Sequence, residues 1–109
     1  MIKRIDIQGS TGSPMRVLLI PAGEACSNHL HLGVDPSEAD LVEFYDGRYP
    51  HTPDGQFISR YYASTLLEDP HTVGLDLMGY EPSWKVDGKT MKLVLNWITY
   101  HQSEMEAQS

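Results

Sequence analysis

The sequence has a single cysteine, few basic residues and no long apolar run. One cysteine, Cys26, excludes an intramolecular disulfide and is typical of a reducing compartment. Eight lysines and arginines against fifteen acidic residues, a net charge of −7, argue against free DNA or RNA as a partner, because phosphate binding needs a basic surface. No apolar run approaches the ~18–20 residues that cross a bilayer, and no secretory signal is visible, so we expect a cytoplasmic protein with no membrane partner.

What is present is typical of a globular chain. The 109 residues are 40% hydrophobic and 21% charged, which is neither a disordered nor a membrane composition. Domains commonly hold about 100–150 residues, so we expect one globular domain over 1–109. Residues 102–109 are polar, and we expect them to form a frayed tail.

The first twenty residues predict an antiparallel hairpin. Residues 2–8 alternate between apolar and charged side chains, and residues 15–20 form a second apolar run. The Gly/Ser/Pro stretch between them, residues 9–14, is typical of a hairpin turn. It lacks the Gly-Lys-Ser/Thr ending of a phosphate-binding loop and is followed by a strand pattern, so we interpret it as a turn.

The segment that starts at Asp35 can be interpreted in two ways. Asp35, Pro36 and Glu38 have the spacing of a helix start, with Leu41, Val42 and Tyr45 on one face. Alternatively, residues 41–45 form a strand that places Val42 and Phe44 on the same side. The capping signal favours the short helix.

The second half of the chain predicts two helices and a short strand. Apolar residues recur at helical spacing over residues 57–68 until Pro70, and again over residues 88–101 after a cap at Asp87. Residues 74–77 alternate as a strand does. The fold class is therefore α+β, a small mainly antiparallel sheet of about three strands with two to three helices packed on one face. We expect the core to contain Leu18, Ile20, Ile58, Leu66, Leu75, Val94 and Ile98.

Cys26, His29 and His31 form the one cluster of metal-ligand types close together in the sequence. Two histidines two residues apart on an extended segment point the same way and could bind one ion, for which Zn²⁺ fits the nitrogen and sulfur donors. Zinc sites normally show paired ligand doublets, and this cluster is alone, so a polar loop that needs no cofactor stays the alternative. Cys26 as a nucleophile with a nearby histidine base is a further possibility, although no family signature surrounds it.

Acidic and aromatic side chains concentrate in the middle of the chain. Residues 24–54 hold seven acidic residues against the single basic residue Arg48. Such a surface steers association with a basic partner, and tyrosine suits protein interfaces because it joins an apolar ring to a polar hydroxyl. The candidate protein-binding residues are Glu38, Glu43, Asp46, Tyr45 and Tyr49. The alternative is an ordinary solvated helix face with some of the aromatics in the core.

No catalytic signature is present, which favours a binding protein over an enzyme. The leading hypothesis is a protein-binding accessory or modulator whose partner is a protein with a basic surface. The alternative is a small metal-binding protein or metal-dependent enzyme that uses Cys26, His29 and His31, and the third hypothesis is self-association. Residues 55–67 and 74–87 resemble a pattern of small bacterial cytoplasmic proteins, to which no activity attaches.

Overall fold

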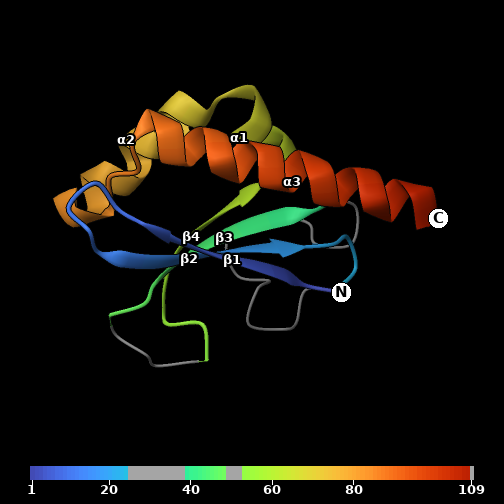
Figure 1. Cartoon of the computed structure of the whole chain (residues 1–109), viewed down its shortest axis with the longest axis horizontal. Coiled ribbons are helices and arrows are strands. Elements are labelled where there is room, and N and C mark those ends of the chain that lie inside the picture. Colours follow the sequence, from blue (N-terminus) through green and yellow to red (C-terminus); the bar gives the residue numbers. More distant parts are fainter. Residues whose placement is uncertain (25–38, 49–52, 109) are drawn as a thin grey trace.

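The fold is a four-stranded antiparallel sheet, with the helices of the described chain on one of its faces (Figure 1). This computed structural model describes residues 1–24, 39–48 and 53–108. The strands are β1 (Lys3–Gln8), β2 (Pro14–Ile20), β3 (Leu41–Asp46) and β4 (Gln56–Tyr62), and they lie in the sheet in chain order. The predicted α+β class is confirmed, with four strands instead of about three.

β1 and β2 form the predicted hairpin. Ile5 lies opposite Val17 and Ile7 lies opposite Met15. In the turn, the Gly9 N–H donates to the Ser13 carbonyl and the Gly12 N–H to the Gly9 carbonyl, both at 2.8 Å. Gly12 has a φ of 84°, a left-handed conformation that glycine adopts without steric cost. The Gly/Ser stretch is therefore a hairpin turn.

The helical layer follows β4 without a break. It consists of α1 (Ala63–Glu68), α2 (Pro70–Tyr80), the short 3₁₀ helix η2 (Pro82–Trp84) and α3 (Gly88–Gln108). The carboxylates of Asp69 and Asp87 accept from backbone N–H groups at the starts of α2 and α3, from Thr72 at 3.2 Å and from Thr90 at 2.7 Å. The predicted cap at Asp87 is confirmed, and such caps satisfy donors that a helix start leaves unpaired. No helix in the described part of the chain is long and apolar enough to cross a membrane.

The sheet buries apolar side chains on both faces, because successive residues of a strand point to opposite sides. The face toward the helices packs against α1, α2 and α3 in one cluster, whose fully buried members include Val17, Phe44, Leu66, Leu77 and Ile98. On the other face, a second cluster of buried residues contains Leu18, Ile20, Leu41 and Tyr45. Leu18 and Ile20 are core residues as predicted, but they lie in this second cluster.

Residues 41–46 form strand β3 and not the predicted helix. β3 pairs with β2 on one side and with β4 on the other, and all six of its residues are buried. A central strand is apolar on both faces, which explains why Leu41, Val42 and Tyr45 fit a helical stripe although the segment is a strand. The Asp35–Glu38 capping pattern, which favoured the helix, lies outside the described residues.

Two more boundaries differ from the prediction. Residues 57–62, predicted as the start of a helix, are strand β4, so helix α1 begins only at Ala63. Residues 74–77, predicted as a strand, lie inside α2, and Leu75 is 48% exposed instead of buried. The predicted helix end at residue 68 is confirmed, since α1 ends at Glu68. The second difference arises because Pro70, at the first helical position after the Asp69 cap, starts another helix.

The predicted helix over 88–101 is confirmed, and it continues beyond its predicted end. α3 runs to Gln108, so most of the polar segment predicted as a frayed tail is helical. The Gln102 amide donates to the Asp40 carboxylate at 2.9 Å, which attaches this part of α3 to the chain just before β3. Leu66, Val94 and Ile98 are fully buried as expected, and Ile58 is partly buried against the same cluster.

Candidate functional site: a groove between two helices

A groove with a volume of about 360 Å³ lies between α2 and the N-terminal half of α3. Its position follows from how α2 uses its apolar residues. Val73 and Leu77 are buried in the core, whereas Leu75 and Met78 point away from it and are 48% and 36% exposed. Because Leu75 and Met78 are three residues apart, they share one face of the helix. α2 therefore carries a second apolar stripe that the core does not use.

The side of the groove opposite α2 comes from α3 and from the segment that leads into it. Met91 and Leu95 line this side, four residues apart on one face of α3. Gly74 on α2 and Gly88 at the start of α3 also line the groove. Open space lies beside both, since a Cβ at Gly88 would meet nothing within 4 Å and one at Gly74 would only touch the Met91 methyl at 4.0 Å. The result is a concave apolar surface between two helices.

The charge of the groove is opposite to that of the chain. Lys85 and Lys92 line it together with His71, and the described residues that line it include no aspartate or glutamate. Lys85 and Lys92 are both exposed. In a chain of net charge −7, this is a local reversal of sign. Such a surface attracts a ligand that is apolar on one side and acidic at its margins.

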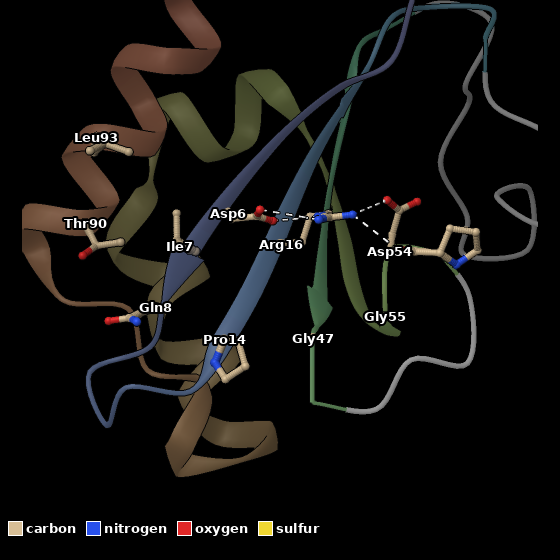
Figure 2. A pocket seen from close by; sticks show the side chains of 11 residues that line it. Asp6, Ile7, Gln8, Pro14, Arg16, Gly47, Asp54, Gly55, Thr90 and Leu93 are labelled. Atoms are coloured by element: carbon tan, nitrogen blue, oxygen red, sulfur yellow. Dashed lines mark hydrogen bonds and ion pairs between the residues drawn. The ribbon is translucent and has the colours of Figure 1, made fainter.

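A second hollow, of about 690 Å³, lies beside β1. Figure 2 shows that it extends from Thr90 and Leu93 on α3, past Ile7 on β1, to Arg16 on β2 and Asp54 before β4. On the sheet face away from the helices, Arg16 connects two carboxylates: its Nε lies 2.7 Å from Asp6 and its Nη1 lies 3.2 Å from Asp54. Arg4 pairs with Asp54 as well, at 2.7 Å.

The contacts within this charged row account for the shifted pKa values of Asp54 and Arg16. Burial raises the pKa of Asp54, but the hydrogen bonds from Arg4 and Arg16 outweigh it, and the pKa lies below the usual aspartate value. The hydrogen bond to Asp6 raises the pKa of Arg16 in turn. Two arginines and two aspartates thus pair with one another in an ion-pair network across the sheet face away from the helices.

Three of the predicted protein-binding residues are buried. Glu43 and Asp46 have no exposed surface, and Tyr45 is only 7% exposed. Glu43 accepts from the Tyr45 hydroxyl and from Arg60 Nε, each at 2.8 Å. Burial and the neighbouring Glu43 carboxylate raise the pKa of Tyr45 above its usual value, which keeps the hydroxyl protonated as a donor. These three side chains therefore do not form an exposed acidic patch.

Asp46 is the buried centre of a second network, at the end of β3. It accepts from Trp84 Nε1 at 2.8 Å, from Arg48 Nη2 at 2.8 Å and from the Arg48 backbone N–H at 2.9 Å. Burial raises the pKa of Asp46, but these donors outweigh it and hold the pKa below the usual aspartate value. The network attaches η2 to the sheet, which is a structural role.

The remaining predicted site residues lie outside the described part of the chain: Glu38, Tyr49, Cys26, His29 and His31. The metal hypothesis on the last three therefore stays a prediction. Among the described residues, no group of three or more histidine, cysteine, aspartate or glutamate side chains could hold a metal ion.

The sequence carries a signal for the groove that the predicted strand over residues 74–77 does not use. The Asp69–Pro70 pair predicts a helix start, and on a helix Leu75 and Met78 fall on a different face from Val73 and Leu77. Two apolar stripes on one short helix indicate that one of them is left for another contact.

Comparison with family models, with curated proteins and with solved structures finds no match to this chain.

Proposed function

We propose that this protein is a protein-binding module that docks an acidic, amphipathic segment of its partner in the groove between α2 and α3. The observation that carries the proposal is the exposed apolar stripe of Leu75 and Met78 beside Lys85 and Lys92. Apolar anchors in a concave site supply binding energy, and charges at the rim favour the correct partner and increase the association rate. An amphipathic helix with apolar residues at helical spacing fits a groove of this kind.

The binding class agrees with the hypothesis from composition, but the expected charge of the partner is reversed. The sequence hypothesis required an acidic surface and a basic partner. Glu43 and Asp46, two of the acids on which it depended, are buried, whereas the groove presents lysines. An acidic partner segment is therefore the better match to the described surface.

A peptide-display library, screened against the folded protein, tests the proposal. We expect the enriched peptides to combine apolar residues at spacings of three and four with aspartate or glutamate beside them. Each should bind the Leu75→Ser variant at least about tenfold more weakly, because Leu75 is an apolar anchor of the groove. Binding should also weaken with salt, since the lysines are exposed.

Leu93→Ser is the matched control, because Leu93 is 51% exposed on α3 but lines the other hollow. It should leave peptide binding unchanged. A Lys85→Glu/Lys92→Glu variant should lose the acidic peptides. A library with no enrichment, basic enriched peptides, or binding that survives Leu75→Ser would overturn the proposal.

A further inference from the structure

β1 is a regular edge strand of the described sheet. Among the described residues, it pairs only with β2, over six consecutive residue pairs without a register shift. The other edge strand, β4, differs. Phe44 lies opposite Ser59 while Tyr45 lies opposite Phe57, which leaves Ile58 as an extra residue in the pairing. Bulges of this kind make an edge a poorer template for strand addition, so β1 is the edge suited to it.

The charged side chains of β1 are complementary to those of β1 in a second, antiparallel copy. Arg4 and Asp6 lie two residues apart on the sheet face away from the helices. Their side chains remain accessible, 47% exposed for Arg4 and 73% for Asp6. An antiparallel strand from a second copy, related by a two-fold axis perpendicular to the sheet, would place residues of the same face opposite each other.

The charges select one register for such a pair. Centred on Ile5, the pairing places each Arg4 opposite the Asp6 of the other copy. Centred on Arg4 or on Asp6, it places like charges opposite each other, which is destabilising. Ile5, at the centre, is only partly buried in the single chain.

α3 adds an apolar flank on the helical side of this edge. Leu93 and Tyr100 lie seven residues apart, on one face of the helix, and are 51% and 62% exposed. Leu93 lines the hollow beside β1 together with Ile7 and Gln8, which places this face next to the edge (Figure 2). A second copy added at β1 would bring a second α3 to the same side and cover exposed apolar surface.

We propose that two copies of this chain associate through β1, in antiparallel register about Ile5, to form a continuous sheet of eight strands with α3 of each copy flanking the junction. The partner is thus a second copy of the chain. The dimer uses the β1 edge and the outer face of α3, whereas the groove lies between α2 and α3, so either proposal can fail without the other.

Two charge reversals, mixed with each other, test the register. Arg4→Glu places carboxylates opposite one another in its own dimer, and Asp6→Arg places guanidinium groups opposite one another. Each variant alone should dimerise at least about tenfold more weakly than the unchanged chain in sedimentation equilibrium. In an equimolar mixture, a heterodimer of the two variants places opposite charges at both contacts between position 4 of one copy and position 6 of the other. Dimers should therefore form again, as heterodimers.

The mixing step separates the interface from the stability of the single chain. Arg4 and Asp6 also pair with Asp54 and Arg16 within the chain, so each variant is checked by circular dichroism for native folding. A loss of dimer caused by damage to the single chain would not recover on mixing. An unchanged chain that sediments at 12.3 kDa at every soluble concentration, or variants whose mixture stays monomeric, would overturn the proposal.

Leu93→Gln provides an independent test that leaves the charged row intact. It should weaken the dimer several-fold, because it replaces apolar surface that the second copy covers. Leu75→Gln is the matched control, with a similar exposure of 48% but a place in the groove, and it should leave the dimer unchanged. Equal effects of the two substitutions would contradict the proposed position of the interface.

Discussion

Arg60 and Glu43 form a buried ion pair across β3 and β4, with Arg60 Nε 2.8 Å from Glu43 Oε2. Neither side chain is more than 1% exposed. The two residues lie directly opposite each other in the strand register, and the Tyr45 hydroxyl donates to the other oxygen of Glu43 at 2.8 Å. The pair lies on the face of the sheet away from the helices, beside the second apolar cluster.

Removing one partner of this pair should be far more damaging than removing both. Arg60→Met takes away the guanidinium that balances a buried carboxylate, and we expect it to lower the free energy of unfolding by about 3–5 kcal/mol. The double variant Glu43→Met/Arg60→Met removes both charges and should recover most of the loss. Urea unfolding of the single and double variants measures both values. A double variant less stable than Arg60→Met would contradict this account.

Asp46 should contribute stability at neutral pH that is lost in acid. Its pKa in the folded protein lies below the ordinary aspartate value, so the unfolded chain binds the proton more readily. The contribution is complete above the ordinary value of about 4 and decreases as the pH falls through the folded pKa. Asp46→Asn should therefore lower the free energy of unfolding by about 1.5–3 kcal/mol at pH 7. The difference in free energy of unfolding between this variant and the unchanged chain should become smaller as the pH falls.

Urea unfolding at a series of pH values checks this expectation. Asp76→Asn is the control, because it removes one carboxylate from an exposed position on α2. This control should change stability within about 0.5 kcal/mol at neutral pH. An Asp46→Asn difference that stays constant down to the acid limit would show that the carboxylate charge is not what the Trp84 and Arg48 donors stabilise.

Truncation of two leucines on the helical layer should have very different effects on the free energy of unfolding. Leu66 on α1 is fully buried, so Leu66→Ala removes apolar contacts and leaves a cavity, at a cost of about 2–5 kcal/mol. Leu75 on α2 faces the groove, and Leu75→Ala should change the free energy of unfolding by no more than about 0.5 kcal/mol. Thermal and urea unfolding of both variants measure these changes. A loss of stability in Leu75→Ala as large as that in Leu66→Ala would refute the assignment of Leu75 to the groove face of α2.

Tyr61 and Tyr62 illustrate where local periodicity misled the prediction. On a helix they would be neighbours that cannot both point inward, but on β4 they point to opposite faces. Tyr61 packs edge-on against Phe44 on the helical side, with 6.0 Å between the ring centroids, and Tyr62 packs against the second cluster. Burial raises the pKa of Tyr61 to about 12. The apolar residues of this short run fit both the helical and the strand spacing. Pairing with β3 makes the run a strand, and local sequence does not reveal that partner.

Elements with local signals were predictable from the amino-acid sequence alone. The hairpin of β1 and β2 is specified by alternation around a glycine turn, and α3 by its cap and its long apolar stripe, because these features depend on residues close in the chain. The α+β class followed from them. Strand β3, the opposition of Glu43 and Arg60, and the groove beside Leu75 depend on pairing and packing between distant segments. Long-range contacts therefore explain why acids that composition places on a surface are buried, and why the exposed apolar stripe lies beside lysines.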